Sequence, residues 1–361
     1  MDAKQLLKLM VDTGASDLHI KVGGPPSIRV SGMLEITDHP PLTAEDVGEV
    51  AAAFIPDRLK PQFETKVEVD FAFSVTDVGR FRVNAFHERG NIGMAFRRVT
   101  VKEPDIDDLG LPPVVKTLAD EPRGLVLVTG TAGSGKTTTL AAMISHINHG
   151  RQGHIVTIED PIEVLHTDDK CVINQREIGI DTNTYADALK HVVRQDPDVV
   201  LIGEMRDIET VQAALTAAEM GNLVLSTLHT IDAGETINRI IDFFPPHQQR
   251  QIQLMLTSTL RGIVSLRLMP KVGGGLVPAI EVCVVTATVR ELINENKIWK
   301  IKEVIEQGEY YGMQSFDQSL IDLYQSGRIA LADALAMSAN AHDFKLKIRQ
   351  LGIVEPSAQE V

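Results

Sequence analysis

The chain has 361 residues, of which 43% are hydrophobic, so it is long enough for two domains and apolar enough to give each a core. Its formal net charge of -14 argues against a protein whose main partner is a nucleic acid, because such proteins usually present a basic face. No apolar run approaches the roughly 20 residues of a membrane span, and the two cysteines, Cys171 and Cys283, lack the spacing of metal ligands. We therefore expect a cytoplasmic protein.

The N-terminal third has the pattern of a small antiparallel sheet. After a short amphipathic helix, which lacks the cleavage site of a signal peptide, residues 16–37 contain short strands joined by a Gly-Gly-Pro-Pro turn. Residues 69–75, 79–86 and 91–99 alternate in the period of half-buried strands. In the second of these, one face carries Phe81, Val83 and Ala85, and the other carries Arg80, Arg82 and Asn84. The N-terminal domain is expected to span residues 1–101.

Residues 102–113 are acidic and rich in proline, which is typical of a linker between domains. Beyond them, short continuous apolar runs alternate with helical patterns, which predicts a parallel sheet covered by helices on both faces. These runs are residues 124–130, 154–160, 198–204 and 222–229. From about Gln248 onward helical patterns dominate. The sequence therefore predicts an α/β domain with C-terminal helices over residues 114–361.

The octapeptide GTAGSGKT, residues 130–137, matches the phosphate-binding loop G-x-x-x-x-G-K-[ST] and lies between an apolar strand and a helical segment. Gly133 and Gly135 allow the backbone to close around phosphate oxygens, so that N–H groups and the helix N-terminus point inward. Lys136 supplies a positive charge to the terminal phosphates, and Thr137 offers a hydroxyl to Mg²⁺. The sequence therefore predicts a nucleotide site.

Three other apolar strands end in groups that suit phosphate chemistry. Glu204 follows the strand in DVVLIGEMRD and is expected to hold the Mg²⁺ shell. The segment HIVTIEDPIEVLH places Glu159, Asp160 and Glu163 after a strand that we expect beside the P-loop strand. One of these three would orient and deprotonate the attacking water, and the spacing alone leaves open which. His229, in STLHT, would sit level with the terminal phosphate.

The four motifs GTAGSGKT, IEDPIEVLH, DVVLIGEMRD and STLHT, in this order, resemble those of the secretion-type ATPases. Within that family the chain is similar to the twitching-motility, or PilT, branch, which drives retraction of type IV pili. The segments SDLHIKVGGPPSIRVSGML, RFRVNAF, INRIIDFFPPHQQ and GMQSFDQSL carry this likeness over nearly the whole chain. The resemblance implies a PAS-like α+β N-terminal domain, a RecA-like P-loop domain with a helical tail, and hydrolysis of ATP with Mg²⁺.

The resemblance also implies roles for individual residues. It makes Glu163 the catalytic glutamate, and it gives Glu204 and His229 the roles of the acidic and histidine motifs. Arg82 and Arg97 would neutralise phosphate charge from the N-terminal domain. Thr137 and Glu204 would hold the metal. The nucleotide-binding positions implied are Gly130, Thr131, Ala132, Gly133, Ser134, Gly135, Lys136, Thr137 and Thr138.

The resemblance implies that the chain forms a homohexamer and binds the inner-membrane platform protein of the pilus machine. A second retraction ATPase is a possible further partner, and no nucleic acid is expected. The chain would then be cytoplasmic and peripheral to the inner membrane at the pilus base. The short linker favours arginines that act on the nucleotide of their own chain.

Two departures from the family pattern bear on function. The P-loop has Thr131 and Ala132 where the branch usually has Pro-Thr, at positions that vary. The tail motif A-I-R-N-L-I-R-E-G-K, associated with retraction, is here ATVRELINENK, residues 287–297. An auxiliary retraction ATPase is therefore an alternative.

Three further alternatives concern other classes of protein. A pilus-assembly or type II secretion ATPase usually carries a Cys₄ zinc site and a further N-terminal domain. A RecA-like DNA motor would have a basic channel. A nucleotide-gated binding protein would show little turnover, which an ATPase measurement distinguishes.

Overall fold

The computed structural model describes residues 3–30, 32–75, 78–99 and 103–353. Lys102, the first residue of the predicted linker, and residues 354–361 at the end of the predicted second domain lie outside these ranges. The chain divides into two compact units, each described by itself. The first contains Met1–Lys102 and Pro161–Leu165, and the second contains Glu103–Asp160 and His166–Val361.

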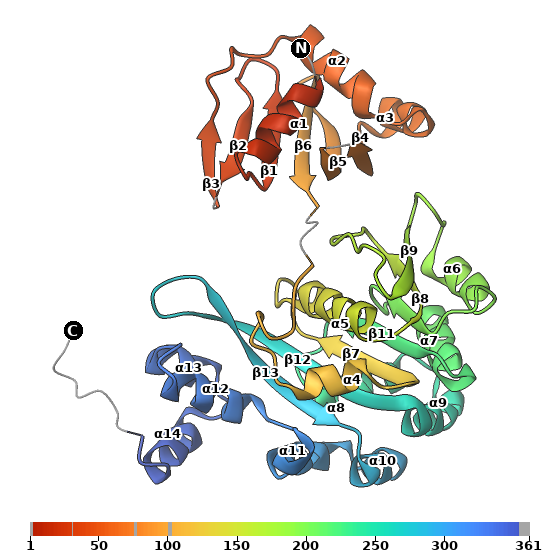
Figure 1. Cartoon of the computed structure of the whole chain (residues 1–361), viewed down its shortest axis with the longest axis vertical. Helices are drawn as coiled ribbons and strands as arrows, with labels where there is room; N and C mark the ends of the chain where they lie inside the picture. Colours follow the sequence, from red (N-terminus) through yellow and green to blue (C-terminus); the bar gives the residue numbers. More distant parts are fainter. Residues whose placement is uncertain (1–2, 31, 76–77, 100–102, 354–361) are drawn as a thin grey trace, which may run out of the picture. The chain divides into compact units, whose positions relative to one another are not determined.

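The first unit is a six-stranded antiparallel sheet with helices packed on it (Figure 1). Its elements are α1 (Ala3–Asp12), β1 (Asp17–Lys21), β2 (Ser27–Val30), β3 (Met33–Ile36), α2 (Ala44–Phe54), α3 (Lys60–Lys66), β4 (Glu68–Val75), β5 (Gly79–Glu88) and β6 (Asn91–Arg98). The strand order is β3-β2-β1-β6-β5-β4. A capping box between Thr43 and Asp46 starts α2. The predicted strands of this unit are all present.

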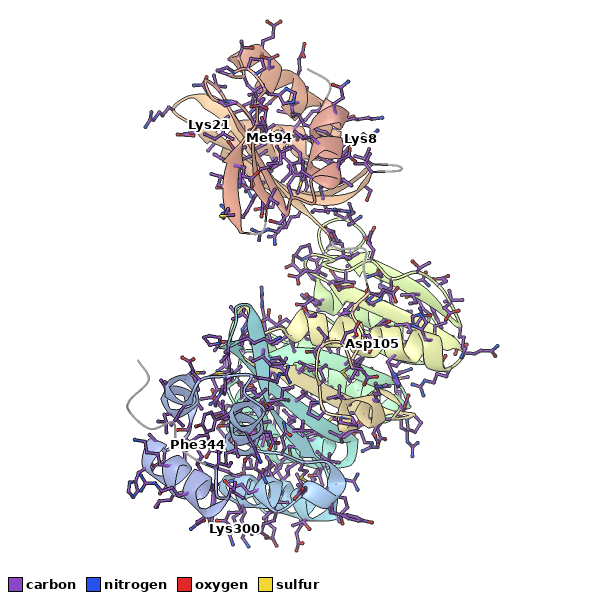
Figure 2. The ribbon with its side chains drawn as sticks, turned by 60° about the vertical axis from the view of Figure 1, so that its left-hand side comes forward. Lys8, Lys21, Met94, Asp105, Lys300 and Phe344 are labelled. Atoms are coloured by element: carbon purple, nitrogen blue, oxygen red, sulfur yellow. The ribbon has the colours of Figure 1, made fainter. Side chains whose placement is uncertain are left out.

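The core of the first unit lies between its sheet and its helices. Phe81, Val83 and Ala85 are fully buried on β5, as their alternation predicts. Met94 of β6, labelled in Figure 2, belongs to the same cluster. Arg80 and Arg82 of β5, and Arg97, the partner of Arg82 on β6, are thereby left on the opposite face of the sheet.

The second unit is a seven-stranded sheet with helices on both faces. Its strands are β7 (Gly124–Thr129), β8 (Gly153–Glu159), β9 (Cys171–Glu177), β10 (Val199–Ile202), β11 (Leu223–Leu228), β12 (Leu260–Pro270) and β13 (Leu276–Val284). Its helices are α4 (Val114–Ala119), α5 (Lys136–Gly150), α6 (Tyr185–Val192), α7 (Ile208–Met220), α8 (Ala233–Asp242), α9 (Pro246–Thr259), α10 (Ala287–Asn294), α11 (Ile301–Glu306), α12 (Phe316–Gln325), α13 (Leu331–Met337) and α14 (Ala341–Gln350). The strand order is β13-β12-β7-β11-β10-β8-β9, parallel except for the β12–β13 hairpin.

Strand β7 shows why the apolar runs of this unit are continuous. Its residues Leu125 and Leu127 pack in one core, with α6 to α9, while Val126 and Val128 pack in the other, with α4 and α5. Since both faces are buried, every position must be apolar. The predicted α/β fold is confirmed.

Two segments differ from what the sequence pattern suggests. The stretch after Gln248 was predicted as mainly helical, but Leu260–Val284 forms the long β12–β13 hairpin, which turns through a run of glycines. Its β-branched residues are buried on both faces, so no alternation marks it as strand. Ile106 and Leu111, within the predicted linker, are buried in a core of the second unit.

The C-terminal helices have a small core of their own at the end of this hairpin. Phe344 of α14, labelled in Figure 2, is fully buried there and clusters with Met269 and Val277 of the hairpin. Across the described residues, none of the helices combines the length and the apolar character that a bilayer crossing requires.

Candidate nucleotide site

The P-loop connects β7 to α5, as the motif predicts. A Cβ atom on Gly130 would come within 2.5 Å of the carbonyl oxygen of Leu266, so only glycine fits there. Gly133 and Gly135 have φ angles of +75° and +97°, the left-handed region that side chains disfavour. These conformations turn successive N–H groups toward one side and make a nest for an anion.

Lys136 lies within this loop and is itself almost fully buried. Its Nζ donates to the carbonyl oxygens of Gly130 at 2.8 Å and Thr131 at 3.0 Å, and it lies 3.4 Å from Nδ1 of His229. The Oγ of Ser134 is buried without a hydrogen-bond partner in the described part of the chain. A buried hydroxyl and an ammonium group inside a nest of N–H groups are the donors that phosphate oxygens accept, so the loop fits a nucleotide.

The strand order decides which other residues reach the loop. The neighbours of β7 are β11, which ends just before His229, and β12. Strand β10, which leads to Glu204, lies beyond β11, and β8 lies beyond β10. The expectation that β8 lies beside the P-loop strand is therefore wrong, because strand order is set by crossover connections that the local pattern does not encode.

His229 and Glu204 form one charged cluster with an arginine that the sequence reading did not assign. Glu204 Oε1 lies 3.0 Å from His229 Nε2, and Glu204 Oε2 lies 2.7 Å from Arg206. Burial raises the pKa of the Glu204 carboxyl, but Arg206 and His229 together outweigh it and hold that pKa below its usual value. With Lys136 3.4 Å from the same histidine, polar contacts run without a break from the P-loop to Arg206.

A cavity of about 280 Å³ lies beside this cluster, lined by Glu204, Arg206, His229 and Arg239, among others. Arg206 is two residues from Glu204 in the sequence DVVLIGEMRD, so its closeness to the acid was the available signal. The guanidinium of Arg239 stacks on the Phe243 ring, 4.8 Å from its centroid. The cavity therefore places two guanidinium groups, those of Arg206 and Arg239, beside two carboxylates, Glu204 and Glu235.

The three carboxylates after β8 are not equivalent. Glu159 is buried and accepts hydrogen bonds from Thr157 at 2.6 Å and Gln175 at 3.1 Å. Asp160 and Glu163 are exposed. The contacts of Glu159 fit a structural role, whereas Glu163, in the segment grouped with the first unit, carries an exposed carboxylate.

Tyr185 is a second group that the sequence reading missed. Its hydroxyl lies 2.9 Å from the position that a Cβ atom on Gly203 would take, so a side chain before Glu204 would displace it. Burial raises the pKa of the Tyr185 phenol, and the charge of Asp160 adds to this. Tyr185 therefore stays a neutral hydrogen-bonding group at the end of β10.

The residues proposed for the metal fit a nucleotide-bound Mg²⁺. The described residues contain no group of three or more His, Cys, Asp or Glu side chains that could hold a metal alone. Magnesium bound with a nucleotide does not require one, since it takes most ligands from phosphates and water. The half-buried Thr137, directly after Lys136, supplies the hydroxyl that such a site uses.

The two arginines of the first unit are cross-strand partners. Arg82 on β5 is paired in register with Arg97 on β6, and Arg97 with Asp17 on β1. Arg97 donates from Nε to the Asp17 carboxylate at 2.8 Å, and Arg82 forms no hydrogen bond or ion pair within the ranges described. Burial raises the pKa of Asp17, but hydrogen bonds from Ser16 and Arg97 hold it below its usual value. Like charges placed opposite each other destabilise a sheet, and here the Asp17 carboxylate offsets the charge of Arg97 while Arg82 stays exposed to solvent.

Comparison with known proteins places the chain in a family. The family model described as "Type II/IV secretion system protein" matches residues 3–275. The chain is 44% identical to the type IV pilus retraction ATPase PilT of Pseudomonas aeruginosa, over 92% of this chain and 97% of that protein. It belongs to the type II/IV secretion family, in its PilT branch. This confirms the resemblance predicted from the four motifs and the enzyme class, a P-loop ATPase.

Two further relatives extend this result. The chain is 41% identical to the type IV pilus ATPase PilU of the same organism, over 97% of this chain and 92% of that protein. A crystal structure of the retraction motor PilT with bound ADP aligns with a TM-score of 0.88 at 43% identity, covering 94% of this chain and 99% of that one. The fold of the PilT branch is therefore shared over nearly the whole chain.

Proposed function

We propose that this chain hydrolyses Mg²⁺-ATP and uses the energy to retract a type IV pilus. The observation that carries the proposal is the set of contacts from Lys136 through His229 to Glu204, built on a P-loop that fits phosphate. Such contacts let a change at the terminal phosphate reach the end of β10. The identity to PilT, the retraction ATPase, supplies the physiological task.

The chemical roles follow from the residue types. The P-loop N–H groups and Lys136 bind the phosphates, and Thr137 with Glu204 hold Mg²⁺ and its water. Glu163 takes the proton from the attacking water, for which an exposed carboxylate is suited. Arg82 and Arg97 neutralise charge on the leaving phosphate.

The motor is proposed to work as a homohexamer bound to the platform protein of the pilus machine, at the cytoplasmic face of the inner membrane. Hydrolysis becomes motion only if domains move against neighbours, and a closed ring provides such neighbours. The first unit would bring Arg82 and Arg97 to the nucleotide of the same chain.

An auxiliary retraction ATPase is the second candidate. The 41% identity to PilU is close to the 44% identity to PilT. The tail segment that departs from the retraction motif forms α10, where Val289 and Ile293 are buried while Glu291 and Asn294 are exposed. The fold of α10 is thus kept while its outer face differs from the family pattern.

Piliation of a deletion strain tests the proposal. Loss of a retraction motor should leave excess pili that do not retract, and the wild-type gene should reverse this while Lys136→Ala should not. Loss of pili would instead assign the chain to assembly. Expression as the sole retraction ATPase separates the two candidates, since only a main motor restores retraction alone.

A further inference from the structure

A second cavity, of about 380 Å³, lies in the second unit between α8, β13, α11 and α12. None of the residues assigned to nucleotide binding or catalysis lines it. Its charged lining residues are Asp232, Glu235, Arg267, Glu281, Lys302 and Asp317. Figure 2 labels Lys300, which lies in the segment between α10 and α11 next to this cavity's Trp299.

Glu281 is the unusual group of this cavity. It lies on β13 with 5% of its surface exposed, and its Oε1 accepts a hydrogen bond from the N–H of Ala233 at 2.9 Å. Its second oxygen has no hydrogen-bond partner and no ion pair in the portion of the chain described. Burial raises the pKa of the carboxyl to about 7, and Asp232 adds to this. A buried carboxylate normally has a cation as its partner.

The cations already present do not fill that role. The guanidinium of Arg267 lies 3.8 Å from the centroid of the Phe316 ring and donates to the carbonyl oxygen of Met337 at 3.3 Å. Lys302 is exposed and forms no ion pair within the described ranges. The lining therefore has four carboxylates against two cations. The charges of Arg267 and Lys302 lower the pKa of Glu281 in part, but neither forms an ion pair with it in the described part of the chain.

Exposed aromatic side chains flank α11 in the sequence, and one of them lines the cavity. Trp299, which lines the cavity, is 69% exposed, and Tyr310 and Tyr311, a few residues after α11, are 92% and 55% exposed. Aromatic side chains are enriched in protein–protein interfaces, where their rings supply contact area. This favours a polypeptide over a small metabolite as the occupant.

We propose that this cavity receives an arginine or lysine side chain from a partner polypeptide. The cationic group pairs with Glu281, and the apolar stem of the side chain lies against Trp299. This inference concerns binding alone, so it stands or falls separately from ATP turnover.

The single tryptophan of the chain provides the measurement, because Trp299 is the only source of indole fluorescence. The full-length protein is titrated with the peptide acetyl-Gly-Leu-Arg-Leu-Gly-amide, with its citrulline analogue as a neutral control of the same shape. We expect a saturable change in fluorescence with the arginine peptide and an affinity at least about tenfold lower for citrulline, as for loss of one charged contact.

Three variants test the residues. Glu281→Gln keeps an oxygen for the Ala233 N–H and should weaken arginine-peptide binding at least about tenfold. Lys302→Gln removes a repelling charge and should strengthen it. Glu303→Gln, an exposed neighbour on α11, is the matched control and should change nothing.

The pH dependence gives a second signature of Glu281. Because its pKa is about 7, the carboxylate form that pairs with a cation becomes dominant as the pH rises through 7. Binding of the arginine peptide should therefore strengthen between about pH 6 and about pH 8, and Glu281→Gln should abolish this change.

Three outcomes would overturn the proposal. One is the absence of a saturable change in fluorescence up to about 20 mM peptide, because a dissociation constant above that concentration is too weak for a specific contact of this kind. Another is equal binding of the arginine and citrulline peptides, or equal binding by Glu281→Gln. The third is an affinity for N-acetyl-argininamide or spermidine as high as for the peptide, which would assign the cavity to a small cation.

Discussion

The P-loop region of the second unit and the arginine strands of the first unit carry charge in opposite ways. Lys136 is buried, and its ammonium group contacts two carbonyl oxygens and His229. Arg97 is 72% exposed along its side chain and is opposed in register by Arg82. Lys136 is thus held by contacts within its own unit. Arg82 and Arg97 instead lie side by side, and the Asp17 carboxylate of β1 pairs with Arg97 alone.

From this difference we expect that nucleotide binding and turnover can be separated by mutation. A site assembled within one unit can bind phosphate by itself. A pair of exposed arginines adds stabilisation only when new negative charge develops near it, as in the transition state of phosphoryl transfer. Changes in the P-loop should therefore affect affinity, and changes in the first unit should affect rate.

The largest effect is expected for Glu163→Gln. Glutamine has the same shape but does not take a proton, so kcat should fall by about 10²–10⁴, the range for a general base. Nucleotide affinity should stay within about threefold, as for a group that acts only in the transition state. Steady-state ATPase assays and fluorescent-nucleotide titration measure both quantities.

Glu219→Gln, at the exposed end of α7, is the matched control for this change. If Glu163→Gln retained turnover within a few-fold of the wild type, Glu163 would not be the base. Glu159, the buried carboxylate of the same segment, would then become the candidate.

Arg97→Ala should lower kcat by about 10²-fold, less than a single arginine finger, because Arg82 remains to share the charge. Nucleotide affinity should change little. The matched control is Arg89→Ala, in the exposed turn between β5 and β6. If Arg97→Ala lowered the affinity for nucleotide and left kcat unchanged, this arginine would contribute to substrate binding and not to the transition state.

Mixed rings show which chain supplies the arginines. If Arg97 acts on the nucleotide of its own chain, subunits with Arg97→Ala mixed with subunits carrying Glu163→Gln should stay inactive, because each site keeps its own defect. Arginines from a neighbour would leave some interfaces with both groups intact. Recovery of ATPase activity after subunit exchange would therefore rule out action within one chain.

Lys136→Ala should weaken nucleotide binding about 10- to 100-fold, the loss expected for one charged hydrogen-bond donor to phosphate. Fluorescent-nucleotide titration checks this, with Lys190→Ala on α6 as the exposed control. An unchanged affinity for nucleotide would contradict the assignment of the P-loop. It would also contradict the division between binding by the P-loop and rate enhancement by the arginines of the first unit.

The smallest effect is expected at Arg206. Arg206 and His229 hold the folded-state pKa of Glu204 below its usual value. The ionised Glu204 therefore stabilises the fold at any pH above the usual pKa of a glutamate, and this contribution is lost as the pH falls through the lowered pKa. Arg206→Ala should raise the folded-state pKa and move the midpoint of acid unfolding to higher pH.

Circular dichroism measures that midpoint, with the exposed Arg123→Ala as control. A midpoint that Arg206→Ala leaves as unchanged as Arg123→Ala does would show that Arg206 does not stabilise the ionised form of Glu204. The 2.7 Å contact would then have no consequence for stability.

The parts of the site that the sequence predicts are those encoded locally. The P-loop can be recognised from an eight-residue motif, because the nest depends on the φ angles of neighbouring residues. The alternation of β5 likewise predicts its buried and charged faces. His229 and Glu204 were placed at strand ends near the P-loop, and the structure brings them into contact with each other.

What sequence could not supply depends on contacts between distant segments. The order β7-β11-β10-β8 follows from crossover connections, so the distance of β8 from the P-loop was misjudged. Two further features depend on contacts between segments that are distant in the sequence. They are the register that places Arg82 opposite Arg97 and the position of the Tyr185 hydroxyl next to Gly203. The β12–β13 hairpin was missed because its residues are buried on both faces, which removes the alternation of a strand.

The most direct test of the central claim is the imaging of fluorescently labelled pili in a deletion strain that expresses either the wild type or Glu163→Gln. The claim is that hydrolysis at this site drives retraction. It predicts that pili extend in both strains, retract with the wild-type protein or with Glu219→Gln, and remain extended with Glu163→Gln. Retraction at the wild-type rate with a Glu163→Gln protein shown to lack ATPase activity would contradict it.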